Sequence, residues 1–118
     1  RVQAAIALAQ REKPPLEKAD AGEWLERQLA AQVPGAATVV AHTIVWQYIA
    51  KETRDKIEAL LKATGDCATN STPLAWLTLE QCAPDQLTEV RLTLWPGGQT
   101  QKIATAHPHG AWIEWLPS

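Results

Sequence analysis

Residues 37–65 read ATVVAHTIVWQYIAKETRDKIEALLKATG, and this stretch decides the predicted fold. Residues 38–41 follow a Pro-Gly turn signal and are mostly β-branched, which favours a short buried strand. Apolar residues then recur at helical spacing over 44–49, and residues 51–64 have the pattern of an amphipathic helix. Gly65 is placed to end that helix in a left-handed conformation. A buried strand followed by a covering helix predicts half of a β-α-β unit.

Two polar residues, His42 and Thr43, follow directly on this strand. Ligands of open α/β sheets bind outside the carboxyl ends of the strands, so both residues are catalytic candidates. A histidine at that position can act as a general base or orient a substrate carboxylate. The alternative is a structural role, in which His42 satisfies free amides of the following helix or packs beneath Trp46.

A second buried strand is predicted at 73–80 (PLAWLTLE), at a spacing that favours parallel pairing with the first strand through a crossover helix. Glu80 ends this strand at the same edge of the sheet and is the third catalytic candidate, with a solvated carboxylate as the alternative. Further strands are predicted at 89–95, 102–106 and 111–116, joined by tight turns. The predicted fold class is α/β, Rossmann-like and three-layered, with parallel strands and crossover helices first and an antiparallel C-terminal meander last.

Two helices are predicted before residue 37. Apolar residues at helical spacing favour a helix over 2–12, which the proline pair at 14–15 ends. Asp20, with Glu23 three positions later, has the pattern of a capping box and starts the second helix, which continues to about Val33.

The chain has 118 residues, enough for one domain with a modest core and too few for two ordinary domains. Its net charge is −2 and its basic residues are scattered, which argues against nucleic acid or an anionic membrane as a partner. Its apolar runs are too short to span a bilayer. Cys67 and Cys82 belong to no CxxC pair, which favours two free thiols in a reducing cytoplasm over a disulfide. We therefore expect a cytoplasmic location.

The sequence begins at Arg1 and contains no methionine. We therefore expect residues 1–118 to form a single domain that is the C-terminal half of a longer protein. A parallel sheet cut in half exposes an apolar edge and an apolar face. The expected partner is accordingly the missing N-terminal portion or a second copy of the chain.

His107 and His109 flank a proline, and two histidines at this spacing can hold a metal if a further ligand such as His42, Cys82 or Glu80 lies nearby. A turn shaped by the proline and the following glycine is the favoured alternative, so we predict no metal site. Neither a glycine-rich phosphate-binding loop nor a GxSxG or HExxH motif occurs in the chain.

The chain carries six tryptophans, and those on the predicted late strands are expected in the core of the sheet. A surface for stacking nucleic-acid bases would need basic neighbours, which these residues lack. The tryptophans concerned are Trp76, Trp95, Trp112 and Trp115.

Several segments together resemble the C-terminal portion of a bacterial family known only as the domain of unknown function number 2332. In chain order they are ADAGEWLERQLA (19–30), TVVAHTIVWQYI (38–49), PLAWLTLE (73–80), RLTLWPGG (91–98) and AHPHGAWIEWL (106–116). Members of that family are longer than this chain. Their overall pattern is similar to the Rossmann-like sheet of S-adenosylmethionine-dependent methyltransferases.

The resemblance implies a methyltransferase-like enzyme domain whose cofactor loop lies upstream, so S-adenosylmethionine could bind only with the missing upstream part. In that case His42 orients or deprotonates a small-molecule acceptor, Thr43 and Glu80 line the cleft, and Trp46 walls the pocket. His107 and His109 would lie nearby as substrate-binding candidates. Two alternatives stay open, a non-catalytic binding or assembly module on the same fold and a metal-dependent hydrolase that uses the two histidines of the turn.

Overall fold

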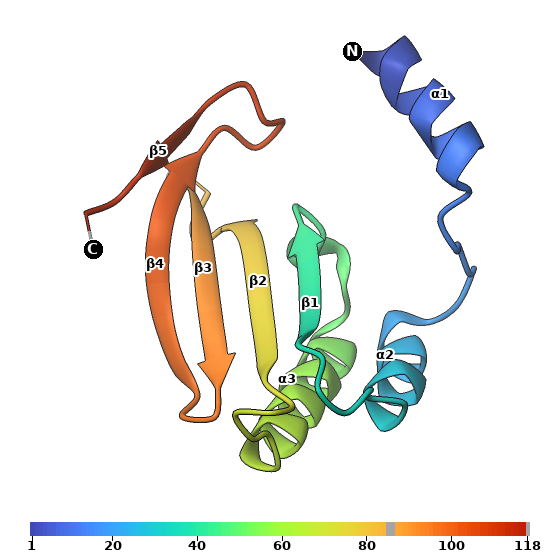
Figure 1. Ribbon diagram of the computed structural model, residues 1–118. Coiled ribbons are helices and arrows are strands. Elements are labelled where there is room, and N and C mark those ends of the chain that lie inside the picture. Colours follow the sequence, from blue (N-terminus) through green and yellow to red (C-terminus); the bar gives the residue numbers. More distant parts are fainter. Residues whose placement is uncertain (85–86, 118) are drawn as a thin grey trace.

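The computed structural model describes residues 1–84 and 87–117, and its elements follow the order expected from the sequence (Figure 1). In chain order they are α1 (Val2–Glu12), α2 (Ala21–Ala30), β1 (Thr38–Thr43), the 3₁₀ turn η1 (Trp46–Tyr48), α3 (Lys51–Asp66), β2 (Leu74–Gln81), β3 (Thr88–Trp95), β4 (Gln99–Ala106) and β5 (Ile113–Trp115). The segment between the strands predicted at 73–80 and 89–95 includes residues 85 and 86, and the predicted domain 1–118 includes residue 118 as well; these three residues lie outside the described residues.

In the part of the chain that the structure describes, the strands form one five-stranded sheet in the order β1-β2-β3-β4-β5. Strands β1 and β2 are parallel, with His42 opposite Thr78, and the other neighbouring pairs are antiparallel. The predicted parallel pair, its connecting helix and the C-terminal meander are therefore confirmed. The protein is a mixed α/β fold.

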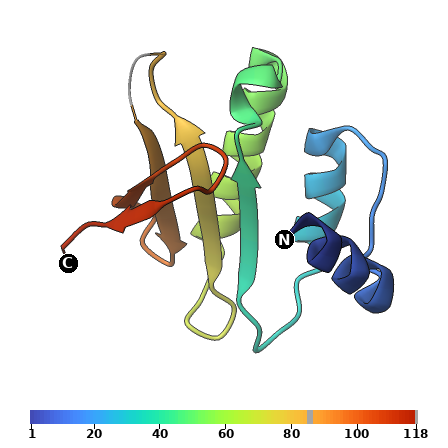
Figure 2. The ribbon, with the colours of Figure 1, turned by 90° about the horizontal axis from the view of Figure 1, so that it is seen from above.

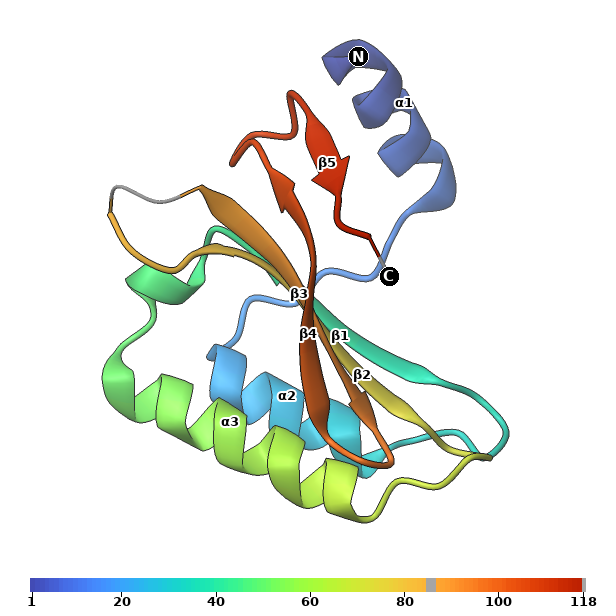
Figure 3. The same ribbon diagram turned by 90° about the vertical axis from the view of Figure 1, so that its left-hand side faces the viewer.

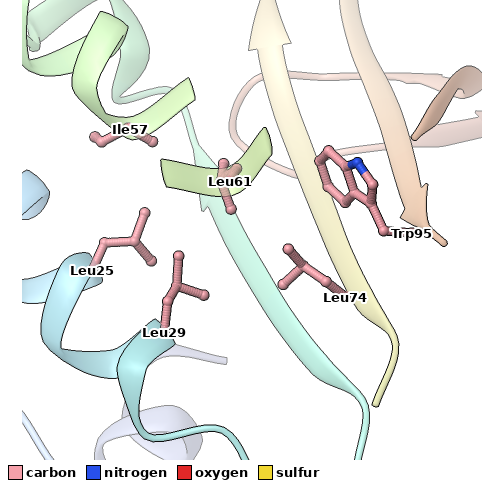
Figure 4. Close-up of a cluster of buried hydrophobic side chains, with 6 residues drawn as sticks. All are labelled: Leu25, Leu29, Ile57, Leu61, Leu74 and Trp95. Carbon is pink, nitrogen blue, oxygen red and sulfur yellow. The ribbon is translucent and has the colours of Figure 1, made fainter. Parts of the chain in front are cut away.

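Helices α2 and α3 pack together on one face of the sheet (Figure 3). Asp20 starts α2 as predicted, because its side chain accepts a hydrogen bond from the backbone N–H of Glu23 at 3.0 Å. The core lies between these helices and the sheet (Figure 4), and consists of Leu25, Leu29, Ile57, Leu61, Leu74 and Trp95. The buried apolar face of each helix thus comes from residues at helical spacing, as the sequence indicated.

The opposite face of the sheet carries apolar side chains that no helix packs against within residues 1–84 and 87–117. Val39 and Leu94 on this face are 59% and 52% exposed. A small cluster of Val90, Ala104 and Ala106 is buried there by neighbouring strand residues. The described residues therefore form two layers, and the three-layer arrangement expected from the sequence is not formed within them.

Helix α1 stands apart from the sheet (Figures 1 and 2). All its residues are exposed. The exposed segment 13–20 joins it to α2. Within residues 1–84 and 87–117, no helix has both the length and the apolar character that crossing a membrane requires.

Two local predictions were wrong. Residues 44–49 do not form an α-helix. Ile44 has a φ of 47°, and Trp46–Tyr48 form a short 3₁₀ turn. Gly65 does not end α3, which continues to Asp66. A Cβ atom at Gly65 would overlap the indole of Trp95, so glycine is needed here for close approach of the helix to β3.

The tryptophans divide between core and surface. Trp95 is buried as predicted, whereas Trp112 and Trp115 are 43% and 65% exposed. Trp115 lies on the edge strand β5 and Trp112 just before it, and every residue of this strand is exposed. Cys67 and Cys82 are both free thiols, as predicted, and both are exposed.

Candidate functional site

The carboxyl ends of the two parallel strands bring His42 and Glu80 together. His42 Nδ1 lies 2.7 Å from Glu80 Oε1, and both side chains are about 15% exposed. The pairing follows from the register, since Thr78 is opposite His42 and Glu80 is two residues further along β2 on the same face. Two of the three predicted catalytic candidates are therefore direct neighbours.

The same carboxylate oxygen of Glu80 also organises the turn after β1. Glu80 Oε1 accepts hydrogen bonds from the backbone N–H groups of Val45 at 3.1 Å and Trp46 at 3.3 Å. These amides lie at the start of the 3₁₀ turn, where no preceding carbonyl is available to them. Glu80 thus fixes this turn, while its second oxygen, Oε2, takes part in no hydrogen bond or ion pair within the described residues.

The second ring nitrogen of His42 is also occupied. Trp76 donates its indole N–H to His42 Nε2 at 3.0 Å. Because Nε2 accepts this bond, the ring proton is on Nδ1, from which it is donated to Glu80. His42 is therefore held at both nitrogens between a carboxylate and an indole, and it can act as a base only if Trp76 moves away.

Two indoles flank the imidazole. The ring of Trp46 stacks on that of His42, with centroids 5.0 Å apart and planes 13° from parallel. Trp46 and Trp76 meet at a centroid distance of 5.7 Å with an interplanar angle of 60°. Such stacked and tilted pairs are favourable arrangements of aromatic rings. Together they form a rigid aromatic wall at the ends of β1 and β2.

This wall borders a cavity of about 310 Å³ on the same face of the sheet as α3. Its volume is at the lower end of the range of small-molecule sites, which is roughly 300–1,000 Å³. Aromatic, hydroxyl and charged groups alternate around it. The lining residues are His42, Trp46, Trp76, Thr78, Glu80, Arg91, Thr93 and Thr100.

A charged cluster lies on β3 and β4 beside the cavity. Glu89 Oε2 is 2.8 Å from Arg91 Nε and 2.7 Å from Arg91 Nη2, and Glu89 Oε1 is 3.1 Å from Lys102 Nζ. The hydrogen bond from Arg91, together with that from Lys102, lowers the pKa of the Glu89 carboxyl to about 2 against the opposing effect of burial. Glu89 also raises the pKa of Arg91, which stays protonated. Two cations share one carboxylate, so the cluster keeps a net positive charge.

Cys82 lies at the edge of this cluster, with its Sγ 3.3 Å from Glu89 Oε2. Partial burial raises the pKa of the Cys82 thiol, and the hydrogen bond to Glu89 raises it further. A thiol held in its protonated form is a weak nucleophile. Cys82 is not among the residues that line the cavity.

The structure separates the other predicted candidates from the cavity. Thr43 is exposed on the opposite face of β1 from His42, because successive side chains of a strand alternate. His107 and His109 lie in the turn after β4, where His107 Nδ1 accepts the backbone N–H of His109 at 3.0 Å. No group of three potential metal-binding side chains occurs in residues 1–84 and 87–117.

Sequence reasoning missed five lining residues, namely Trp76, Thr78, Arg91, Thr93 and Thr100. One signal for most of them is present. Polar or aromatic residues occupy alternate positions of β2 (Trp76, Thr78, Glu80) and of β3 (Arg91, Thr93). Polar residues that recur every second position along interior strands indicate a face that is not filled by core.

Comparison with known proteins identifies the family. Neither the curated proteins nor the solved structures gave a match. The family described as "Uncharacterized protein conserved in bacteria (DUF2332)" matches residues 1–115. This is the family that the segments in the sequence resemble, and the match extends over nearly the whole chain, so the protein belongs to this uncharacterised bacterial family.

Proposed function

We propose that the chain is the substrate-binding part of an α/β enzyme domain, and that the cavity beside His42 holds a small polar substrate. The observation that carries this proposal is the Glu80 carboxylate. Oε1 is fixed by three donors, whereas Oε2 takes part in no hydrogen bond or ion pair within the described residues, and Glu80 lines the cavity together with Trp46 and Trp76. A preorganised polar group in a small cavity at the carboxyl ends of parallel strands is typical of a ligand site.

The domain is methyltransferase-like under this proposal. The parallel unit β1-α3-β2 followed by antiparallel strands supports a relation to the Rossmann-like sheet of those enzymes. S-adenosylmethionine, when bound, supplies the methyl group. The residues of this chain hold the acceptor: Glu80 Oε2 accepts a hydrogen bond from its N–H or O–H group, and Trp46 excludes water from one side. His42 is a positioning residue, because its Nε2 is engaged by Trp76.

The binding proposal is tested with the indole N–H signals of the six tryptophans in a ¹H–¹⁵N spectrum. A library of small polar compounds, charged and uncharged, is titrated into the protein at millimolar concentration. Binding in the cavity should shift the signals of Trp46 and Trp76 and leave those of Trp112 and Trp115 unchanged, because the latter pair lies outside the cavity. A library in which no compound shifts the two cavity signals overturns the proposal.

A pair of matched variants locates the binding site. Thr78→Leu introduces apolar volume into the cavity wall and should abolish the shifts. Gln101→Leu makes a similar change at an exposed position of β4 outside the cavity lining, and should leave them intact. The methyltransferase assignment is tested separately by calorimetry of the protein with S-adenosylmethionine. Absence of binding heat at millimolar cofactor, for the longest form of the protein that can be prepared, rejects that assignment and leaves the cavity proposal standing.

A second candidate function, assembly, is favoured by a different observation. The sheet face opposite α2 and α3 presents the exposed Val39 and Leu94, and α1 presents an apolar stripe at helical spacing that includes Val2 and Ile6. Contiguous exposed apolar surfaces commonly mark interfaces. We propose that a second copy of the chain covers them, because a two-fold pair would bury the stripe of each copy on the sheet of the other.

Sedimentation of the protein over a range of concentrations tests the assembly. The chain of 12.9 kDa should sediment at twice that mass. Ile6→Lys and Leu94→Lys should each give the monomer, since either places a charge in the interface. Leu16→Lys is the matched control, because Leu16 is 90% exposed in the segment between α1 and α2 and lies in neither surface. A monomer at all concentrations contradicts this second function.

A further inference from the structure

Two residues of opposite charge, Glu80 and Arg91, line the cavity. Glu80 contributes the oxygen Oε2. Arg91, which lies opposite Thr78 on the adjacent strand, also lines the cavity. Glu80 and Arg91 are diagonal neighbours across the β2-β3 pair, a relation that places Cα atoms about 7–8 Å apart. No ion pair joins the two side chains within the described residues.

The guanidinium of Arg91 is bound to Glu89 along one of its edges. Nε and Nη2 both bond to Glu89 Oε2, at 2.8 and 2.7 Å. The second edge, made by Nη1 and the remaining hydrogen of Nη2, takes part in no ion pair within residues 1–84 and 87–117, and the neighbouring Cys82 thiol is the other side chain that interacts with the guanidinium. This edge has the fork geometry that binds a carboxylate with two parallel hydrogen bonds. The Glu89 carboxylate, shared with Lys102, holds the guanidinium in place.

The Glu80 side of the cavity has the features of a site for a cation. Glu80 lines the cavity together with Trp46 and Trp76, and its Oε2 takes part in no hydrogen bond or ion pair within the described residues. A carboxylate neutralises an ammonium group directly, and an indole face attracts it further. The imidazole does not compete, because His42 is neutral in the tautomer set by its two hydrogen bonds.

We infer that the cavity takes a zwitterionic ligand of the α-amino acid type, with its ammonium group on Glu80 Oε2 and its carboxylate on the second edge of Arg91. Thr93 and Thr100 add a hydroxyl pair, 2.7 Å apart, of which one hydrogen remains free to donate to the ligand. The volume of about 310 Å³ leaves room for a small side chain. This inference rests on the proposed function, because it names the substrate class of that cavity.

The experiment compares three matched forms of each probe by the same indole signals. Free L-α-amino acids are titrated beside their carboxamides, which lack the carboxylate, and their N-acetyl derivatives, which lack the ammonium group. At least one free amino acid should shift the Trp46 and Trp76 signals, and both of its blocked forms should bind at least about tenfold more weakly, the factor that about 1.4 kcal/mol supplies. Blocked forms that bind as well as the free amino acid overturn the inference.

Two variants test which residue binds the carboxylate of the ligand and which binds its ammonium group. Arg91→Gln should weaken binding of the free amino acid about tenfold and leave its carboxamide unchanged, because only the former has a carboxylate to lose. Lys102→Gln is the matched control, since it removes the other cation bound to Glu89 but is not a lining residue, and it should retain affinity. Glu80→Gln keeps an oxygen for the backbone donors and should weaken the free amino acid and spare the N-acetyl form.

The outcomes separate this inference from the proposed function. Shifts of the two cavity signals by uncharged compounds alone keep the cavity as a ligand site and reject the zwitterion. Shifts by no compound at all reject both. Equal effects of Arg91→Gln and Lys102→Gln on affinity also reject the inference. The ligand carboxylate would then respond to the net positive charge of the cluster and would not bind specifically to the guanidinium of Arg91.

Discussion

His42 and Glu80 are 38 positions apart in the sequence, yet Nδ1 of one lies 2.7 Å from Oε1 of the other. The contact closes the carboxyl ends of the parallel pair β1-β2, and it is extended by Trp76 on the far side of the imidazole. A carboxylate, an imidazole and an indole therefore form a chain of hydrogen bonds in a partly buried site. The hydrogen bonds in such a chain polarise one another and fix the orientation of each ring. The cavity owes its shape to this chain, and four predictions address it and its surroundings.

The imidazole of His42 should be in the Nδ1–H tautomer. The indole N–H of Trp76 needs an acceptor, so Nε2 must carry the lone pair. Long-range ¹H–¹⁵N correlation spectra of the histidine rings distinguish the two nitrogens. A predominant Nε2–H form in the wild-type protein contradicts the assignment. Trp76→Phe, which removes the donor to Nε2, should leave Nδ1 protonated, because the Glu80 carboxylate still accepts its hydrogen bond.

Replacing Glu80 by alanine should lower the free energy of unfolding by about 2–4 kcal/mol. The loss of Oε1 leaves His42 Nδ1 and the amides of Val45 and Trp46 without their acceptor, and each unsatisfied buried group costs about 1–3 kcal/mol. Glu80→Gln retains an acceptor oxygen and should cost less than half as much. Urea unfolding followed by circular dichroism measures both variants, and equal losses would show that the turn does not depend on this oxygen.

Replacing Gly65 by alanine should destabilise the protein, in contrast with the usual effect of alanine in a helix. Alanine is favoured over glycine in a helix interior by about 1 kcal/mol. At position 65, however, the added Cβ would overlap the indole of Trp95 in β3. Overpacking of this kind costs about 1–3 kcal/mol.

A second substitution tests the cause of that loss. Trp95→Leu removes the indole, so in that background Gly65→Ala should be neutral or stabilising. The free energy of unfolding of the four proteins in this double-mutant cycle gives the coupling directly. Additive losses would mean that the contact with Trp95 is not the reason for glycine at this position.

The Glu89 cluster should make stability depend on acidic pH. The pKa of the Glu89 carboxyl is lowered from its ordinary value of 4.5 to about 2 in the folded protein, chiefly by the hydrogen bond from Arg91. The unfolded chain therefore takes up the proton first as the pH falls. The contribution of Glu89 to stability is complete above about pH 4.5 and is lost as the pH falls from there toward 2.

Urea midpoints measured between these pH values test the sign. Glu89→Gln should flatten the loss of stability in this window, because the glutamine side chain does not titrate. Arg91→Gln should flatten it partly, since it removes the main cause of the lowered pKa while Lys102 remains. A parallel fall of stability with pH in the wild type and in Glu89→Gln would remove the cluster from the explanation.

Much of the fold could be predicted because its determinants are local. The spacing of apolar residues indicated α1 and α3, and the Asp20 cap, confirmed by its bond to the amide of Glu23, indicated where α2 begins. The parallel pairing of β1 with β2 was also predictable, because a strand, a helix and a strand at this spacing leave few other topologies. That pairing was sufficient to bring His42 and Glu80 to one edge of the sheet.

The local predictions were wrong where the same residue type or spacing occurs in two different backbone structures. Glycine ends helices and also allows close packing, so the sequence around Gly65 could not distinguish these roles without Trp95 of a distant strand. The apolar spacing over 44–49 suggested a helix, but the hydrogen bonds from Val45 and Trp46 to Glu80 hold the chain in a tighter turn. Thr43 was selected for its place next to His42, and the alternation of the strand turned it to the other face.

The sequence by itself determined the order of the elements, the mixed α/β class and the edge of the sheet where polar residues gather, because periodicity, caps and turns act over a few neighbouring residues. Only the tertiary structure decided that the Trp76 indole donates to His42 Nε2 and that Glu80 Oε2 has no hydrogen-bond partner among the described residues. It also decided that Arg91 lines the cavity while one edge of its guanidinium binds Glu89. These relations join different strands and depend on register and side-chain orientation. Both are fixed by packing and by the requirement that buried polar groups find partners, which no local pattern specifies.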